Sequence, residues 1–342
     1  MPTHSENELI ERIRRAIPSS PHKAAAGARV GIGDDAAVVR PRLGRELVIS
    51  TDQFHDGRHF LVQRHSPDSV GYKVLARSSS DLAAMGATPL YFFLNLALPA
   101  ARAGAWLDRF LRGMARAARQ FKMVLLGGDL ASLPTVAISL AVMGDIAPGR
   151  AVTRSGARPG DAIFVSGTLG SAALGLEMFL HRGRRAVQGS VRVSGAAADA
   201  LRAHLYPQPR LGLGQWLVQN RLASSMIDVS DGFSTDLAHL CTASGVGAKI
   251  KSASVPVTRM TALTKKLALD PFTLAMHGGE DYELLFTVPA RMVARMPTRF
   301  GNLALTRIGE ITRSRKLLLL SSSGTARPLA IHGWNHFRRN YR

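Results

Sequence analysis

Residues 46–52 read ELVISTD, a stretch in which a strand passes directly into polar side chains. The apolar run Leu47–Ile49 has the composition of a buried strand, and Ser50, Thr51 and Asp52 follow at its end. A strand end delivers side chains to the rim of a sheet, where a ligand can reach them. The stretch therefore predicts a strand that carries a carboxylate into a binding site.

Further strands and helices are expected on both sides of this stretch. LYFFLNLALP (90–99), MVLLGGD (123–129) and TVAISLAVMGDI (135–146) have strand character. Apolar spacing predicts helices over 6–16 and 105–120, a helix from Pro67 through Leu75, and a separate turn over 81–85. Because the strands and helices do not alternate strictly, the pattern favours an α+β fold over a doubly wound sheet.

The chain is long enough for two domains, and its pattern is interrupted once near the middle. Pro148–Gly149 breaks the run of strands, and RSGARPGDAIFVSG (154–167) starts a new turn and strand. A strand ending at Asp228 and a helix over 234–244 follow. We therefore expect one domain over residues 1–149 and a second over residues 150–342.

The composition is that of a folded protein with packed cores. Of 342 residues, 46% are hydrophobic and 20% are charged, which excludes a disordered chain. The sequence has no apolar run of the ~18 residues that span a bilayer, and the N-terminus lacks the order of a signal peptide. The single cysteine, Cys241, excludes an intramolecular disulfide and a cysteine-ligated zinc site, and it is expected in a helix core. A cytoplasmic protein that does not enter membranes is expected.

A net charge of +20 raises the possibility of a nucleic-acid partner. The basic residues are scattered along the chain, however, without the dense block or interleaved aromatic residues of a dedicated binding arm. A positive surface also attracts phosphorylated small molecules. No specific nucleic-acid partner is therefore expected.

The carboxylates are few but concentrated. Of 24 acidic residues, eleven lie in a few short segments, and most of these eleven follow an apolar strand or adjoin a glycine: Asp34, Asp35, Asp52, Asp81, Asp129, Asp228, Asp231, Asp236, Glu280, Asp281 and Glu283. Converging carboxylates repel one another unless cations lie between them. Oxygen ligands without cysteine favour Mg²⁺, which in proteins usually also holds substrate phosphates. The pattern predicts a magnesium–nucleotide site.

Several of these motifs also have purely structural interpretations. The aspartates of GIGDDA (31–36) are typical of a turn, and we assign Asp236 to capping the helix that it enters rather than to a metal. Glu283 is expected to face solvent on a strand that follows a glycine turn. The sequence has neither a Walker loop nor a GxGxxG motif opening a βαβ unit, which disfavours P-loop kinases and Rossmann dehydrogenases.

Taken in order, the motifs resemble those of the thiamine-monophosphate kinase family, in the aminoimidazole-ribonucleotide synthetase superfamily. The resemblance covers the chain from Gly31 to Phe337. It is carried by GIGDDAAVV (31–39), STDQFHDGRHF (50–60), SDLAAMGATP (80–89), LLGGD (125–129), TRSGARPGD (153–161), DVSDGFSTDL (228–237), GGEDYELLF (278–286) and GWNHF (333–337).

The resemblance implies an enzyme that uses ATP to phosphorylate thiamine monophosphate to thiamine diphosphate. It implies a homodimer in which residues 1–149 bind ATP and magnesium and dimerise, and residues 150–342 complete the active-site cleft. The implied ligands of several magnesium ions are Asp35, Ser50, Thr51, Asp52, Asp81, Asp129, Asp228 and Asp231. The implied nucleotide contacts are Gly128, Asp129, Arg154 and Ser230, and the implied thiamine phosphate contacts are His59, Glu280 and Trp334.

These assignments agree with the needs of phosphoryl transfer, which are positioning and charge neutralisation. Asp129 and Asp231 are the expected catalytic residues, and no general base is assigned because the acceptor is already an anion. Arg154 is suited to forked contacts with phosphate oxygens, and Trp334 to stacking on a cationic ring. The sequence departs from the family pattern at Ser78, Leu130 and Asn335, which we interpret as changes around the site.

Three alternatives remain at this point. Another member of the superfamily would phosphorylate or activate a different acceptor, although the chain lacks the reactive cysteine of selenophosphate synthetase and the terminal cysteine of the hydrogenase-maturation protein. A basic nucleic-acid-binding protein would have to explain the clustered acids. An inactive homologue would keep the fold and lose Mg–ATP binding.

Overall fold

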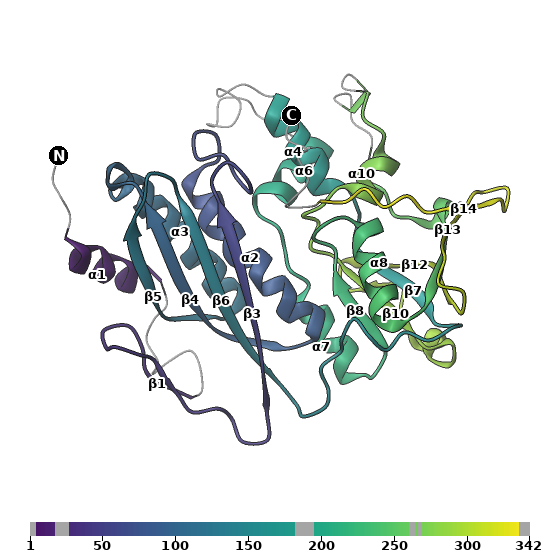
Figure 1. Cartoon of the computed structure of the whole chain (residues 1–342), viewed down its shortest axis with the longest axis horizontal. Coiled ribbons are helices and arrows are strands. Elements are labelled where there is room, and N and C mark those ends of the chain that lie inside the picture. The colour runs from purple at the N-terminus through teal and green to yellow at the C-terminus, as the bar shows by residue number, and fades with distance from the viewer. Residues whose placement is uncertain (1–4, 18–26, 182–194, 260–263, 266–267, 335–342) are drawn as a thin grey trace. The chain divides into compact units, whose positions relative to one another are not determined.

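The computed structural model describes residues 5–17, 27–181, 195–259, 264–265 and 268–334, which form two compact units (Figure 1). The described residues up to Leu82 and residues 87–151 form the first unit. Residues 83–86 and the described residues from Val152 onward form the second. The mixture of sheets and helices confirms the expected α+β class. The functional roles expected of residues 1–149 and 150–342 stay predictions.

The first unit is built on a four-stranded sheet in the order β3-β6-β4-β5. Only the pair β4 and β5 is parallel. The elements of this unit are α1 (Glu6–Ala16), β1 (Ala28–Val30), β2 (Val38–Val39), β3 (Glu46–His55), α2 (Pro67–Met85), β4 (Thr88–Leu98), the 3₁₀ helix η1 (Ala100–Arg102), α3 (Ala105–Phe121), β5 (Val124–Ser132) and β6 (Ala137–Ile146).

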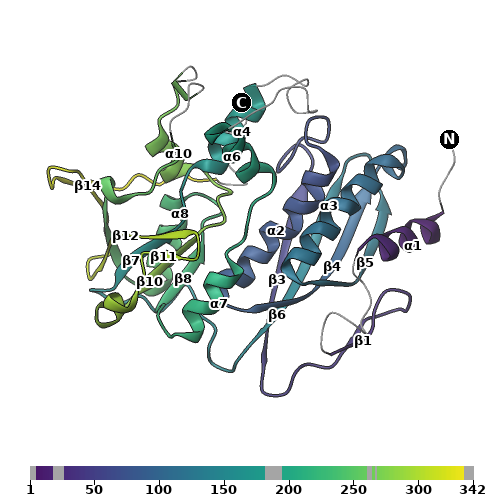
Figure 2. The same ribbon diagram turned by 180° about the vertical axis from the view of Figure 1, so that it is seen from behind.

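Helices α2 and α3 cover one face of this sheet, as the views from both sides show (Figures 1 and 2). α3 buries a stripe that includes Leu107, Phe110, Leu111 and Met114, which recur at helical spacing. α2 is one continuous helix of 19 residues. The prediction of a separate turn over 81–85 was therefore wrong, because residues 72–85 contain no proline or glycine that would end the helix before Gly86.

The second unit is built on a sheet in the order β14-β13-β9-β12-β7-β10-β8, with β11 paired to β12. Its elements are β7 (Ala162–Ser166), α4 (Ser171–His181), α6 (Ala196–Leu205), α7 (Leu211–Gln219), β8 (Ser225–Asp228), α8 (Phe233–Ser244), β9 (Gly247–Lys251), η2 (Ser252–Ser254), α10 (Pro271–His277), β10 (Leu284–Val288), η3 (Ala290–Arg295), β11 (Arg299–Phe300), β12 (Leu303–Thr312), β13 (Leu317–Leu320) and β14 (Ala326–Pro328).

Both faces of this second sheet are buried, which explains the continuous apolar runs of its central strands. Ile163 and Leu285 enter one core together with α8. Phe164 and Phe286 enter the other core together with α7, and their rings stack at 5.7 Å. Cys241 lies in α8, where burial raises the pKa of its thiol to about 12, so its expected place in a core is confirmed.

None of the helices in the described ranges has the length and apolar character needed to cross a bilayer.

Candidate functional site

In the first unit, Asp52 lies on the helix-covered side of the sheet, where an arginine already holds it. Arg77 of α2 donates from Nε to Oδ2 of Asp52 at 2.7 Å and from Nη2 to Oδ1 at 2.9 Å. Ser78 donates to the same carboxylate at 3.4 Å. Such a bidentate pair neutralises the carboxylate while no cation is bound. Sequence analysis missed Arg77, whose only signal is its position as a lone charge within VLARSSS.

The neighbouring residues Ser50 and Thr51 face opposite sides of the same strand. Ser50 donates a hydrogen bond to Asp81 of α2, so both lie on the side of Asp52. Thr51 is exposed on the other side of β3 because successive strand residues alternate in direction. The three consecutive residues Ser50, Thr51 and Asp52 therefore do not point at a single position.

Asp129 lies on the same open side of the sheet as Thr51, at the other end of the strand order. It pairs in register with Asn95, which in turn pairs with Ser139. Strands β6 and β4 separate β3 from β5, so Asp129 lies about 14 Å across the sheet from Gln53, with which it is in register. Thr51 lies two residues from Gln53 along β3, and therefore farther from Asp129. The preceding Gly128 has φ +153°, and a Cβ atom there would lie 1.8 Å from the carbonyl oxygen of Leu94. Glycine is thus required at 128 for strand packing.

The last two predicted residues of the first unit lie in loops. Asp35 is exposed, and its N–H donates to the side chain of Asp34 at 2.9 Å, as the turn interpretation predicts. His59 accepts a hydrogen bond at Nδ1 from the N–H of His55, at 3.0 Å, and its ring lies 5.5 Å from that of Phe54. The ring of His59 thereby contacts the last two residues of β3.

In the second unit, the loop after β8 gathers the predicted carboxylates around a structural one. Asp236 accepts hydrogen bonds at Oδ2 from the N–H groups of Ser230, Asp231 and Gly232, at 3.1 to 3.2 Å. Burial raises the pKa of Asp236 well above its usual value, and the charges of Asp228 and Asp231 raise it further. The assignment of Asp236 to the helix start is consistent with these bonds.

Backbone hydrogen bonds connect this loop to two other predicted residues. The N–H of Glu280 donates to the carbonyl of Ser230 at 2.8 Å, and the N–H of Trp334 donates to the carbonyl of Asp231 at 2.8 Å. The structure therefore brings together Ser230, Asp231, Glu280 and Trp334, which are separated by up to about a hundred residues in sequence. Asn335 lies outside the described residues.

Glu280 is held in an unusual conformation by a residue that sequence analysis missed. Its φ is +67°, in the left-handed region that costs a non-glycine residue of order 1 kcal/mol. Its Oε2 lies 3.2 Å from Nδ1 of His204 on α6, a side chain that is 1% exposed. Strained residues of this kind concentrate at functional sites. The only sequence signal for His204 is a histidine on the apolar face of a helix.

Two acidic residues after Glu280, Asp281 and Glu283, are held in place by hydrogen bonds and an ion pair. Asp281 accepts the N–H groups of Gly170 and Ala172 at 2.6 and 3.0 Å. Glu283 is 4% exposed and forms a bidentate ion pair with Arg210, with Nε donating to Oε2 at 2.7 Å. The expectation that Glu283 faces solvent was wrong, because Arg210 and a hydrogen bond from Ser166 at 2.5 Å compensate its charge in the interior.

Arg154 is the predicted residue of this unit with the most exposed setting. It lies in the loop before β7, and its carbonyl accepts a hydrogen bond from Ser244 at 2.9 Å. Its guanidinium forms no hydrogen bond or ion pair with the rest of the described chain. It is therefore available to an anion.

Oxygen donors dominate both groups, which fits Mg²⁺ better than a softer metal. The repulsion that Asp228 and Asp231 exert on Asp236 is the kind that a bound cation relieves. Within the ranges that the structure describes, no three His, Cys, Asp or Glu side chains are close enough together to hold a metal ion by themselves. Phosphate or water oxygens would have to complete the coordination, as is usual for Mg²⁺.

Comparison with known proteins shows similarity along almost the whole chain. The AIR synthase related protein family matches with its N-terminal domain over residues 33–146 and its C-terminal domain over residues 158–319. Thiamine-monophosphate kinase of Escherichia coli K12 is 39% identical over 337 residues, which cover 97% of this chain and 98% of the relative.

Two solved structures agree with this similarity. The crystal structure of thiamine-monophosphate kinase from Stenotrophomonas maltophilia K279a has a TM-score of 0.77 at 34% identity and covers 93% of this chain and 96% of its own. AaThiL complexed with AMPPCP and TMP has a TM-score of 0.75 at 30% identity and covers 97% of both chains.

Proposed function

The chain belongs to the thiamine-monophosphate kinase family, and we propose that it transfers a phosphoryl group from ATP directly to the phosphate of thiamine monophosphate, forming thiamine diphosphate. The observation in the structure that carries this proposal is the convergence of Ser230, Asp231, Glu280 and Trp334 through backbone hydrogen bonds. These residues come from two loops and the C-terminal segment, and they combine a carboxylate pair with an aromatic face.

The proposed roles follow from the chemistry of each side chain. Trp334 stacks on the cationic ring of the thiamine moiety, since a tryptophan face attracts cations. Glu280, whose Oε2 lies beside Nδ1 of His204, contacts the same substrate. Arg154 and the hydroxyl group of Ser230 bind phosphate oxygens of the nucleotide. His59 in the first unit remains a proposed contact of thiamine phosphate.

The expected magnesium ligands are Asp228 and Asp231 in the second unit, and Asp35, Ser50, Thr51, Asp52, Asp81 and Asp129 in the first. Bound Mg²⁺ would neutralise charge on the phosphates. A cation held by Asp52 would compete with Arg77 for the same carboxylate oxygens. The acceptor phosphate attacks as an anion, so no side chain has to remove a proton. Proton transfer is therefore not expected to limit the rate.

A homodimer is the expected assembly, and the open face of the first sheet supports it. Leu47 and Ile49 of β3 are 44% and 56% exposed on this face. Ile49 pairs with Met143 and Thr51 with Ala141, so apolar side chains continue onto β6. We propose that the same face of a second copy of the chain packs against this face. The compartment that we propose is the cytoplasm.

Asp231→Asn tests the site, because it removes one charge and keeps the size of the side chain. We expect loss of thiamine diphosphate formation by at least about 100-fold, which corresponds to about 2.7 kcal/mol of transition-state stabilisation. Asp129→Asn should behave alike, whereas Asp199→Asn, on the exposed side of α6, should keep normal activity. Near-normal turnover by both site variants, with unchanged folding by circular dichroism, would refute the metal assignment.

A further inference from the structure

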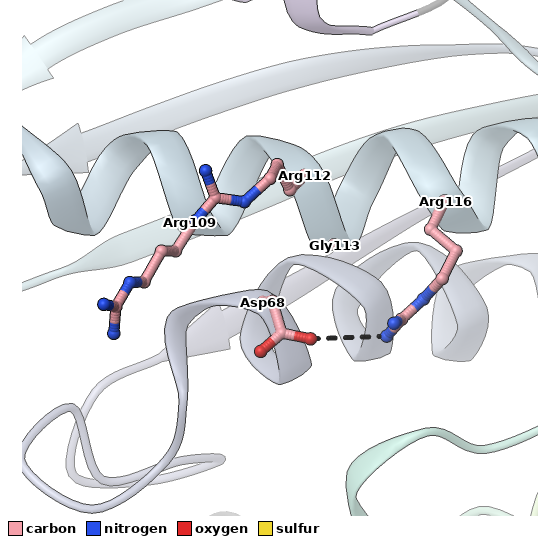
Figure 3. Close-up of a pocket in the computed structure, with 5 residues that line it drawn as sticks. All are labelled: Asp68, Arg109, Arg112, Gly113 and Arg116. Carbon is pink, nitrogen blue, oxygen red and sulfur yellow. Dashed lines mark hydrogen bonds and ion pairs between the residues drawn. The ribbon is translucent and has the colours of Figure 1, made fainter. Parts of the chain in front are cut away.

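A surface pocket of about 460 Å³ in the first unit is lined by residues of α2 and α3, three of which are arginines (Figure 3). None of the residues that line it is one of the predicted catalytic residues. Its lining residues are Asp68 of α2 and Arg109, Arg112, Gly113 and Arg116 of α3. We propose that this pocket binds a compact anion with two or more phosphate groups, at a site separate from the proposed phosphoryl-transfer site.

The arginines form a row along the exposed side of α3. Arg109, Arg112 and Arg116 are spaced three and four residues apart, so they share one helix face over about 10 Å. All three are exposed, while the opposite face of α3 is buried in the core. Figure 3 shows Arg109 and Arg116 on either side of Asp68, with Arg112 above them along the helix. The guanidinium groups are thus spread along the pocket, and that of Arg116 lies beside Asp68.

The positive charge of this row is only partly compensated. Arg116 contacts Asp68 at 3.4 Å and lies over the ring of Tyr72 at 5.1 Å. Across the described ranges, neither Arg109 nor Arg112 forms a hydrogen bond or ion pair through its side chain. Three cations and one carboxylate leave a local excess of two positive charges, whose mutual repulsion an anion would relieve.

The floor of the pocket is made by an unusually close approach of two helices. A Cβ atom at Gly113 would lie 1.8 Å from the carbonyl oxygen of Asp68, and one at Gly71 would lie 2.0 Å from the carbonyl oxygen of Phe110. The two glycines therefore bring α2 and α3 into backbone contact. The contact at Gly113 brings the backbone of Asp68 against α3, beside the three arginines that line the pocket.

The side-chain chemistry selects the class of ligand. A guanidinium presents its donors in a planar fork that matches phosphate oxygens, and three such forks suit a multiply charged anion better than a single carboxylate. A nucleic-acid groove usually needs more phosphate contacts than three residues can give. Arg119, the next exposed arginine on α3, does not line the pocket. The arrangement therefore fits one compact anion rather than a polynucleotide.

The test uses the full chain and sodium triphosphate as the probe, in EDTA so that metal-dependent binding at the other site is absent. Isothermal titration should show that the double variant R109Q/R112Q binds triphosphate at least about tenfold more weakly than the wild type, which is about 1.4 kcal/mol. Arg119→Gln, the matched control on the same helix, should bind within twofold of the wild type. Equal affinity of the wild type and R109Q/R112Q would overturn the proposal.

Two further measurements show where triphosphate binds and whether the negative charge of Asp68 weakens its binding. Triphosphate should slow amide hydrogen exchange in residues 105–121 of the wild type but not of R109Q/R112Q. Asp68→Asn should strengthen triphosphate binding about threefold or more, because it removes the one negative charge in the pocket. Protection confined to other segments, or weaker binding by Asp68→Asn, would contradict the site.

A single-stranded oligonucleotide separates the compact anion from a polymer. We expect the oligonucleotide to bind no more tightly than triphosphate. If Arg119→Gln lowered oligonucleotide affinity as much as R109Q/R112Q did, and triphosphate failed to bind, the row would be a polynucleotide contact and the proposal would be wrong.

Discussion

At the scale of single residues, the second unit buries carboxylates that ordinary solvation would keep outside. Asp281 is partly buried, and its two oxygens accept backbone N–H groups at the start of α4. Burial raises the pKa of Asp281 from its usual value near 3.8 to about 7, although the two hydrogen bonds act in the opposite direction. Asp281, which follows Glu280, is thus neutral at low pH and charged at high pH.

This shift predicts how stability depends on pH. The folded state holds the proton of Asp281 up to about pH 7, whereas the unfolded chain releases it near pH 4, so stability from this residue is present at low pH and lost as pH rises. Between pH 5 and pH 7.5 we expect the free energy of unfolding of the wild type to fall by about 2 kcal/mol relative to Asp281→Asn. Urea denaturation at both pH values measures this, and parallel pH curves would contradict it.

At the scale of elements, the ion pair of Arg210 and Glu283 joins three segments of the second unit. Arg210 precedes α7, Glu283 precedes β10, and Ser166 ends β7. Burial lowers the pKa of Arg210, but the charge of Glu283 and its hydrogen bond outweigh burial and leave the pKa raised. The pair thereby fixes the start of the strand that follows Glu280.

Arg210→Ala tests this connection. The substitution leaves the carboxylate of Glu283 buried without its counter-charge, so we expect a loss of about 3 kcal/mol in the free energy of unfolding. Arg307→Ala, which removes an exposed arginine from β12, should change stability by less than about 0.5 kcal/mol. Similar denaturation midpoints for the two variants would show that the ion pair does not stabilise this unit.

Much of the element pattern and part of the candidate site could be predicted from the sequence. Local signals sufficed for α3 and α8, whose apolar spacing is regular, and for the loop that carries Asp231. The expectation of a buried strand ending at residues 50–52 was wrong, because Leu47 and Ile49 lie on the open face of the sheet and β3 continues to His55. The site predictions that failed concern residues whose partners are distant in the sequence. Glu283 was expected to face solvent because its partner Arg210 lies 73 residues away and could not be identified from the sequence. His204 and Arg77 were missed for the same reason, because neither stands in a motif.

At the scale of the whole molecule, the open sheet face of the first unit leads to a prediction about assembly. Ile49→Lys places a charge in the middle of the face that we propose to be covered by a second copy, so it should convert a dimer into a monomer at micromolar concentration. Leu43→Lys, in the fully exposed loop before β3, should remain dimeric. Sedimentation velocity distinguishes these outcomes, and an unchanged dimer in Ile49→Lys would exclude this face.

The central claim is that this chain converts thiamine monophosphate to thiamine diphosphate with ATP. The most direct measurement is to incubate the purified protein with ATP, Mg²⁺ and thiamine monophosphate and to separate the products by chromatography, with EDTA in a parallel sample. We predict thiamine diphosphate and ADP in equal amounts, and neither in EDTA. Absence of thiamine diphosphate from a folded protein that binds Mg–ATP would contradict the assignment of the acceptor.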